Sequence, residues 1–158
     1  MVIDSLRAHH FLCIATYQGK GYSPDFVANM NRVWAHAKGG NVGAVRATAE
    51  ADPICHACPH LRERDDPVSC RFQTSIGARD RRMIQAMDWE ENQQVSFEDV
   101  MEVVHARHKD LMDQVCNGCD WVPICAQQRF TLRDPHFVLP VEPATAPSSS
   151  ELSVAPGP

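Results

Sequence analysis

Six cysteines of this 158-residue chain form two groups whose spacing suits metal binding. The first group contains Cys55, Cys58 and Cys70, and the second contains Cys116, Cys119 and Cys125. Each group begins with two cysteines separated by two residues, so that one turn can bring both thiolates onto the same metal or cluster. In a chain whose thiols remain reduced, such paired spacings indicate metal binding, whereas isolated cysteines are more often packing residues.

The second group supplies three thiolates, whereas a cubane 4Fe–4S cluster or a tetrahedral Zn²⁺ takes four ligands. We expect the fourth ligand to come from the first group once the chain folds back. A 4Fe–4S cluster is favoured because the 45 residues between Cys70 and Cys116 are long for a zinc ribbon. The spacing from Cys116 to Cys125 is also similar to a local pattern in the auxiliary-cluster domains of radical peptide-modifying enzymes. Zinc is the alternative cofactor, since structural zinc sites tolerate variable separations.

His10 and Cys13 are further candidate ligands because they lie one turn apart on one face of an expected helix. With the six grouped cysteines they would make eight ligands, which suits two four-ligand centres. Both can equally be core residues, since an isolated cysteine on an apolar stripe usually packs. A thiolate-bound cluster also needs nearby cations to offset its negative charge. Candidates beside the first group are Arg62, Arg64 and Arg71.

The composition of the chain limits the classes of function. A formal net charge of −5 argues against general nucleic-acid binding, which needs a surplus of lysine and arginine on one face. No apolar run approaches the roughly 20 residues of a membrane-spanning helix, so no membrane association is expected. The N-terminus lacks the uninterrupted apolar core of a secretory signal. We therefore expect a cytoplasmic protein.

The elements that position the cysteines are expected to be mostly helices, because apolar residues recur at helical spacing. The expected helices are residues 7–17, a helix that begins at Pro24 behind a Ser23 cap and ends at Gly39, residues 78–88, and a long helix from the Ser96 cap to Cys116. One short strand is expected over residues 45–49. The segment 52–70 is rich in Cys, His, Pro and Arg, and this composition predicts an irregular loop.

These elements predict a mainly α fold with minor β structure. We expect a small single helical domain over residues 1–139, in which helices support irregular, cysteine-rich metal-binding loops. Residues 140–158 contain prolines and a run of serines with almost no large apolar side chains. That composition predicts a disordered tail, because it cannot bury enough surface to offset its chain entropy.

Four sequence motifs resemble those of an uncharacterised prokaryotic family, the domain of unknown function 1284. The motifs are Leu6-Arg7-Ala8-His9-His10-Phe11-Leu12-Cys13, Gly19 to Ser23 with Phe26 to Asn29, Asp52 through His60, and Cys116 to Cys125 with Trp121. The resemblance covers about residues 5–126. Ala8 stands where a proline would be expected, a change that removes no candidate ligand. The resemblance implies an iron–sulfur protein with no assigned reaction.

The expected role is electron transfer, or redox or iron sensing, by an accessory protein with a protein redox partner. One alternative is a zinc-stabilised interaction module without redox activity, in which the same thiolates only hold the fold together. Another is an enzyme that uses its cluster as a Lewis acid at an open coordination position. No phosphate-binding loop, carboxylate pair or serine triad occurs at recognisable spacing, so no catalytic residue is assigned.

Overall fold

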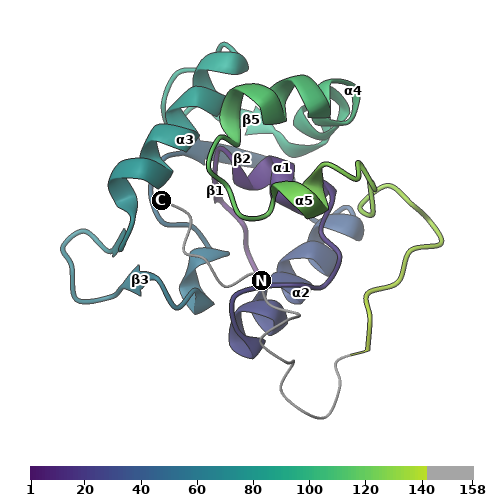
Figure 1. Ribbon diagram of the computed structural model, residues 1–158, viewed down its shortest axis with the longest axis horizontal. Coiled ribbons are helices and arrows are strands. Elements are labelled where there is room, and N and C mark those ends of the chain that lie inside the picture. Colours follow the sequence, from purple (N-terminus) through teal and green to yellow (C-terminus); the bar gives the residue numbers. More distant parts are fainter. Residues whose placement is uncertain (142–158) are drawn as a thin grey trace.

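Short strands alternate with longer helices along the chain (Figure 1). The computed structural model describes residues 1–141; residues 142–158 of the expected tail lie outside this range. The elements are β1 (Ser5–Arg7), α1 (His10–Ala15), α2 (Pro24–Lys38), β2 (Ala44–Thr48), the 3-10 turn η1 (Cys55–Ala57), β3 (Leu61–Arg62), β4 (Ser69–Cys70), α3 (Gln73–Ala86), β5 (Gln94–Ser96), α4 (Phe97–Val115) and α5 (Val122–Cys125). The fold is mainly α with a minor β component, which confirms the predicted class.

The two longest helices begin at the serine caps that the sequence predicted. Ser23 Oγ accepts a hydrogen bond of 3.2 Å from the Phe26 N–H at the start of α2, where Pro24 occupies the first helical position. Ser96 Oγ accepts a bond of 3.3 Å from the Asp99 N–H at the start of α4. Such caps satisfy N–H groups that have no partner inside the helix, so a helix start can be recognised locally.

The expected helix over residues 7–17 is wrong at its N-terminal end. Residues 5–7 form β1, which pairs in parallel with β2, and only His10–Ala15 are helical. The antiparallel strand β5 pairs with the other edge of β2, giving the sheet order β1-β2-β5. Neither β1 nor β5 was predicted, because three-residue strands form through long-range pairing rather than through a local sequence pattern. Helix α3 also begins at Gln73, earlier than the expected residue 78.

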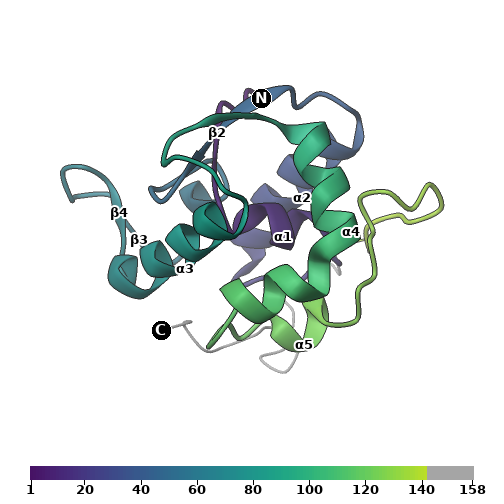
Figure 2. The same ribbon diagram turned by 90° about the horizontal axis from the view of Figure 1, so that it is seen from above.

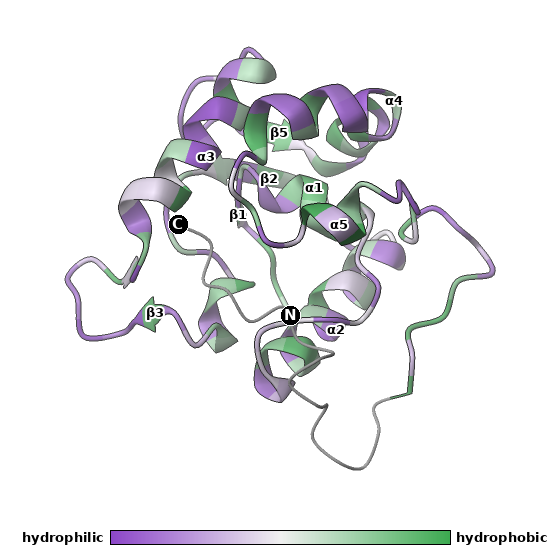
Figure 3. Ribbon diagram, in the orientation of Figure 1, coloured by the Kyte–Doolittle hydropathy of each residue, from purple (hydrophilic) through white to green (hydrophobic). Residues whose placement is uncertain are grey.

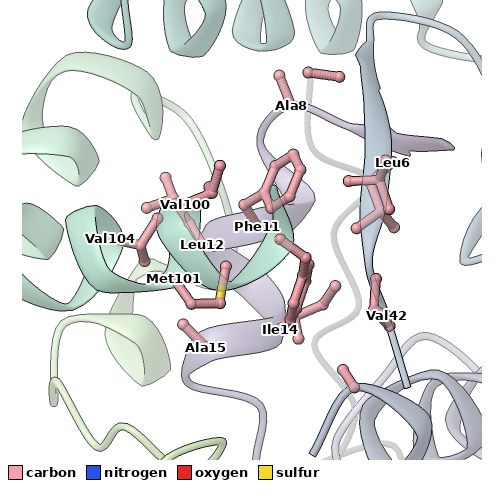
Figure 4. Close-up of a cluster of buried hydrophobic side chains, with 14 of the residues drawn as sticks. Leu6, Ala8, Phe11, Leu12, Ile14, Ala15, Val42, Val100, Met101 and Val104 are labelled. Carbon is pink, nitrogen blue, oxygen red and sulfur yellow. The ribbon is translucent and has the colours of Figure 1, made fainter. Parts of the chain in front are cut away.

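Helix α1 lies at the centre of the molecule in both ribbon views (Figures 1 and 2). Its residues Phe11, Leu12 and Ile14 are fully buried, and α1 packs against α4. Figure 4 shows Leu12 beside Val100 and Val104 of α4. Much of the outer surface of α4 is hydrophilic, as Figure 3 shows, so its apolar stripe faces inward as the sequence predicted.

The cysteine-bearing segments contain little regular structure. Residues 52–70 form only η1 and the two-residue strands β3 and β4, in agreement with the expected irregular loop.

The segment after α5 is anchored to the core by hydrogen bonds. Lys38 Nζ donates to the carbonyl oxygens of Thr131 (2.8 Å) and Asp134 (2.6 Å). The buried Thr131 hydroxyl donates to the Tyr17 carbonyl at 2.6 Å.

None of the helices within residues 1–141 is long and apolar enough to cross a bilayer.

Candidate metal centre

A single cavity of about 120 Å³ brings cysteines from distant parts of the chain together. The cysteines that line it are Cys13, Cys55, Cys58, Cys70, Cys119 and Cys125. All seven cysteines of the chain, including Cys116, are free thiols. Helix α1 forms one wall, and the loops that carry the two predicted cysteine groups form others. The structure therefore places every candidate cysteine at or next to one site.

The C-terminal cysteine loop is curled by its own backbone hydrogen bonds. The Cys116 N–H donates to the last turn of α4, and the Cys119 N–H donates to the Cys116 carbonyl at 3.0 Å. Between them, Gly118 has φ of +74°, in the left-handed region that only glycine adopts without strain. The short helix α5 then places Cys125, whose N–H donates to the Trp121 carbonyl at 3.0 Å. The loop thus brings three thiols back toward the cavity.

Cys13 is the fourth thiol at this loop. Burial raises the pKa of Cys13 well above its usual range, and the negative charges of the three C-terminal cysteine thiolates raise it further. Cys13, Cys119 and Cys125 line the same cavity, and Cys116 lies three residues before Cys119 in the curled loop. The side chain of Thr16, which directly follows α1, acts to lower the pKa of Cys125. We name Cys13, Cys116, Cys119 and Cys125 the Cys13 set; the sequence had assigned the fourth position to another cysteine.

The remaining cysteines, Cys55, Cys58 and Cys70, form the Cys55 set. Burial raises the pKa of Cys58, and the nearby charge of Cys70 raises it further. The Cys58 N–H donates to the Cys55 carbonyl at 2.9 Å, which closes the turn η1. Cys70 Sγ accepts a bond of 3.4 Å from the Phe72 N–H, just before α3. This set provides three thiols on one side of the cavity.

Asp52 organises the start of the Cys55 loop. Its Oδ1 accepts the N–H groups of Ile54 (2.9 Å) and Cys55 (3.1 Å), and its Oδ2 accepts the Arg7 N–H at 2.7 Å. Its Oδ2 also lies 2.7 Å from Nδ1 of His10. Burial alone would raise the pKa of Asp52, but His10 and the backbone donors outweigh burial and lower this pKa strongly. The carboxylate is therefore ionised and accepts four hydrogen bonds.

The distances between ligand atoms can be compared with those expected around a single zinc ion. In a tetrahedral site with Zn–S bonds of about 2.3 Å, the thiolate sulfurs lie about 3.8 Å apart. Within residues 1–141, the one trio of ligand atoms that lie within 4.8 Å of one another comes from His10, Asp52 and Cys55. No three cysteine sulfurs of the described chain are drawn together so closely. Soft thiolates bind both zinc and iron–sulfur clusters, so both cofactors remain candidates for this cavity.

Comparison with known proteins places this arrangement in a family. Residues 21–125 match the family described as "Protein of unknown function (DUF1284)". The chain belongs to the DUF1284 family. The match contains the Cys55 set and the three C-terminal cysteines, whereas His10 and Cys13 precede it. No curated protein and no solved structure matches the chain.

Buried arginines, rather than the expected ones, place positive charge beside the cysteines of this DUF1284 chain. Arg62, Arg64 and Arg71 are exposed. By contrast, Arg7 and Arg79 are 1% and 4% exposed and line the cavity. The charge of Arg7 acts to lower the pKa of Cys55 and Cys58, and that of Arg79 acts on Cys13 and Cys116 in the same way. These cations can offset the negative charge of a thiolate-bound cluster.

A second buried network fixes Arg7 in place. The Arg7 guanidinium lies 2.7 Å from Asp80, whose side chain is fully buried. The same carboxylate accepts a bond of 3.1 Å from the His9 N–H and contacts the His9 ring. Burial lowers the pKa of His9 to about 4 despite the nearby Asp80, so this ring is neutral. The sequence pattern did not identify Arg7 or Asp80, because each is an ordinary polar residue until the fold buries the pair.

Aromatic side chains cover the space between the two cysteine loops. The Tyr22 ring contacts His60 (ring centroids 5.0 Å apart) and Trp121 (5.3 Å), and His60 in turn contacts Phe72 (5.1 Å). All four side chains line the cavity. Burial raises the pKa of Tyr22, which therefore remains neutral. These half-buried rings form an aromatic part of the cavity wall.

The electrostatics of the metal-free thiols indicate what the site can bind. Burial and neighbouring thiolates raise the pKa of Cys116 to about 12, and burial is the main reason that the pKa of Cys125 rises to about 11. These thiols are protonated at neutral pH unless a cation replaces their protons. A metal or cluster would bind them as thiolates and release those protons. The arrangement thus suits a cationic metal group, whose charge would offset that of the thiolates.

Proposed function

We propose that this chain is an iron–sulfur protein whose Cys13 set holds a 4Fe–4S cluster. The observation that carries the proposal is the position of Cys13, which lines the same cavity as Cys119 and Cys125, while Cys116 begins the loop that carries both of them. Four thiolates match the four irons of a cubane. The buried Arg79 acts to lower the pKa of Cys13 and Cys116, so it places positive charge beside this set.

A cluster with four cysteine ligands favours electron transfer or redox sensing over catalysis. A Lewis-acid site keeps one coordination position open for its substrate, and four thiolates leave no iron of a cubane without a protein ligand. The exposed turn at Asn117 and Gly118 lies between two ligands, and we assign electron entry from a protein redox partner to this turn. Reduced thiols of this kind persist in the cytoplasm, where we place the protein.

The proposal is tested by purifying the full chain without oxygen and measuring iron, zinc and acid-labile sulfide per chain. We expect a brown protein with iron and sulfide in equal amounts, about four of each for every cubane. Electron paramagnetic resonance after reduction and reoxidation should show a reversible signal. A colourless protein with stoichiometric zinc and no sulfide would overturn the cluster and favour the zinc-stabilised interaction module.

A further inference from the structure

The Cys55 set has three thiols and needs one more ligand to complete a four-ligand centre. Cys13 is already assigned to the proposed cluster of the Cys13 set, although it lines the same cavity. Asp52 cannot supply the missing ligand, since both of its oxygens already accept two hydrogen bonds each. The nearby ring nitrogens remain as donors.

His10 offers such a nitrogen at the right place. One of its ring nitrogens lies within 4.8 Å of the Cys55 sulfur, and its side chain is 13% exposed and lines the cavity. The contact with the Asp52 carboxylate, which can only accept, requires His10 Nδ1 to carry the proton. In the neutral ring Nε2 is then the atom with a free lone pair. It makes no hydrogen bond within residues 1–141.

This arrangement matches the way proteins prepare histidines for metals. A metal-binding imidazole usually donates its other N–H to a carboxylate, which fixes the tautomer and the ring orientation. Here Asp52 also positions the Cys55 N–H, so one carboxylate orients two ligands of the same set. Of the other histidines near this set, His56 is exposed and His9 contacts Asp80. His60 lies between Tyr22 and Phe72 and has no carboxylate partner within the described residues.

We propose that Cys55, Cys58, Cys70 and His10 hold a second iron–sulfur cluster, with His10 Nε2 as its nitrogen ligand and Asp52 as a positioning residue. This inference rests on the proposed function, since it requires that the protein carries clusters. A neutral imidazole adds one less negative charge than a thiolate, and histidine ligation raises cluster reduction potentials. The second cluster therefore has the higher potential, and electrons pass to it from the cluster of the Cys13 set.

The test uses the full chain purified without oxygen after growth with ¹⁵N-histidine or with ordinary histidine. We expect about eight iron and eight sulfide per chain. Pulsed electron paramagnetic resonance of the reduced protein should show a strong nitrogen coupling that changes with the histidine isotope. His10→Ala should remove that coupling and about half of the iron. His10→Cys should restore the iron without the coupling. His60→Ala, which removes another histidine that lines the cavity, should keep the coupling.

The outcomes separate this inference from the proposed function. About four iron per chain, all lost in Cys119→Ala, would retain the proposed function and overturn the second cluster. About eight iron per chain without a nitrogen coupling that depends on the histidine isotope would overturn histidine ligation. A nitrogen coupling that persists in His10→Cys would overturn ligation by His10. Loss of the coupling in His60→Ala alone would transfer the ligand role to His60 and also overturn the proposal. Stoichiometric zinc without sulfide would overturn both proposals together.

Discussion

His10 Nδ1 lies 2.7 Å from Asp52 Oδ2, and this contact joins the first turn of α1 to the beginning of the first cysteine loop. The two residues are 42 positions apart in the sequence. Because the Asp52 carboxylate also accepts the N–H of Cys55, the histidine and the first thiol of the loop are held by one side chain. The N-terminal helix is thus part of the site rather than only part of the core.

Replacing Asp52 with asparagine should lower both the stability of the protein and its iron content. In Asp52→Asn, one of the two acceptor oxygens becomes an NH₂ group that faces N–H donors. We expect a loss of stability of about 2–3 kcal/mol in urea unfolding, because buried donors lose their partner. Iron per chain should fall by about half, since the second cluster loses its positioning residue. Glu63→Gln, an exposed change in the same loop, is the matched control. Full iron content in Asp52→Asn would contradict the positioning role.

The variant Cys13→Ala tests whether Cys13 is a cluster ligand or a residue that only packs in the core. If Cys13 completes the Cys13 set, iron and sulfide per chain should fall by one cubane, and the histidine-sensitive resonance signal should remain. Gln127→Ala, an exposed change near Cys125, should leave the metal content unchanged. An unchanged iron content in Cys13→Ala, with only the loss of about 1 kcal/mol typical of a point substitution, would assign Cys13 to the core.

Gly118→Ala tests the curl of the C-terminal loop. The residue has φ of +74°, where an L-residue with a Cβ is strained by about 1–2 kcal/mol. We expect the variant to lose iron to a chelator several times faster than the unmodified protein, followed by visible absorbance. Gly43→Ala serves as the control, because a Cβ there would meet no atom within 4 Å. Equal rates for Gly118→Ala and the unmodified protein would show that the loop accommodates the change.

Asp80→Asn should destabilise the whole fold. The change leaves the buried Arg7 guanidinium without its charge partner, and breaking a buried pair costs about 3–5 kcal/mol. Urea unfolding at pH 7 measures the loss. The control Asp113→Asn breaks an exposed pair with Lys109 and should have no measurable effect on unfolding. A similarly small effect of Asp80→Asn would show that the buried pair does not stabilise the fold.

The stability difference between the unmodified protein and Asp80→Asn should depend on pH. Burial acts to raise the pKa of Asp80, but the partners His9 and Arg7 outweigh burial and lower it. A carboxyl with a lowered pKa stabilises the fold fully above its unfolded-state pKa of about 3.9. Its contribution is lost as the pH falls through the lowered folded pKa. The difference should thus be constant from pH 7 to pH 5 and should shrink below about pH 4; a constant difference down to pH 3 would contradict this reasoning.

The helices that local signals define were the part of the fold that the sequence could predict. Ser23 and Ser96 act through hydrogen bonds to residues three positions away, so the starts of α2 and α4 can be read from neighbouring residues. Strand β1 could not be predicted in this way. Its residue Arg7 is buried only because Asp80, 73 positions later, is brought beside it. Helix α5 is four residues long, which is too short for a periodic pattern.

The candidate site was predicted in composition but not in arrangement. The pairs at Cys55 and Cys116 are local patterns, so the two cysteine groups were evident from spacing. The place of Cys13 depends on the packing of α1 against α4, and no spacing rule connects it to Cys116. The role of Asp52 was also hidden, although it lies in one of the recognised motifs. Its function follows from four hydrogen bonds, two of which cross to residues in the first ten positions.

The buried hydrogen bond from Thr131 to Tyr17 joins positions 114 residues apart, and this separation has a consequence for synthesis. A ribosome adds about 5–20 residues per second, so α1 emerges roughly 6–23 s before the segment that anchors against it. The last member of the Cys13 set, Cys125, is synthesised only six residues before Thr131. If this set binds the proposed cluster, the order of synthesis therefore delays cluster assembly until nearly the whole described chain has been made.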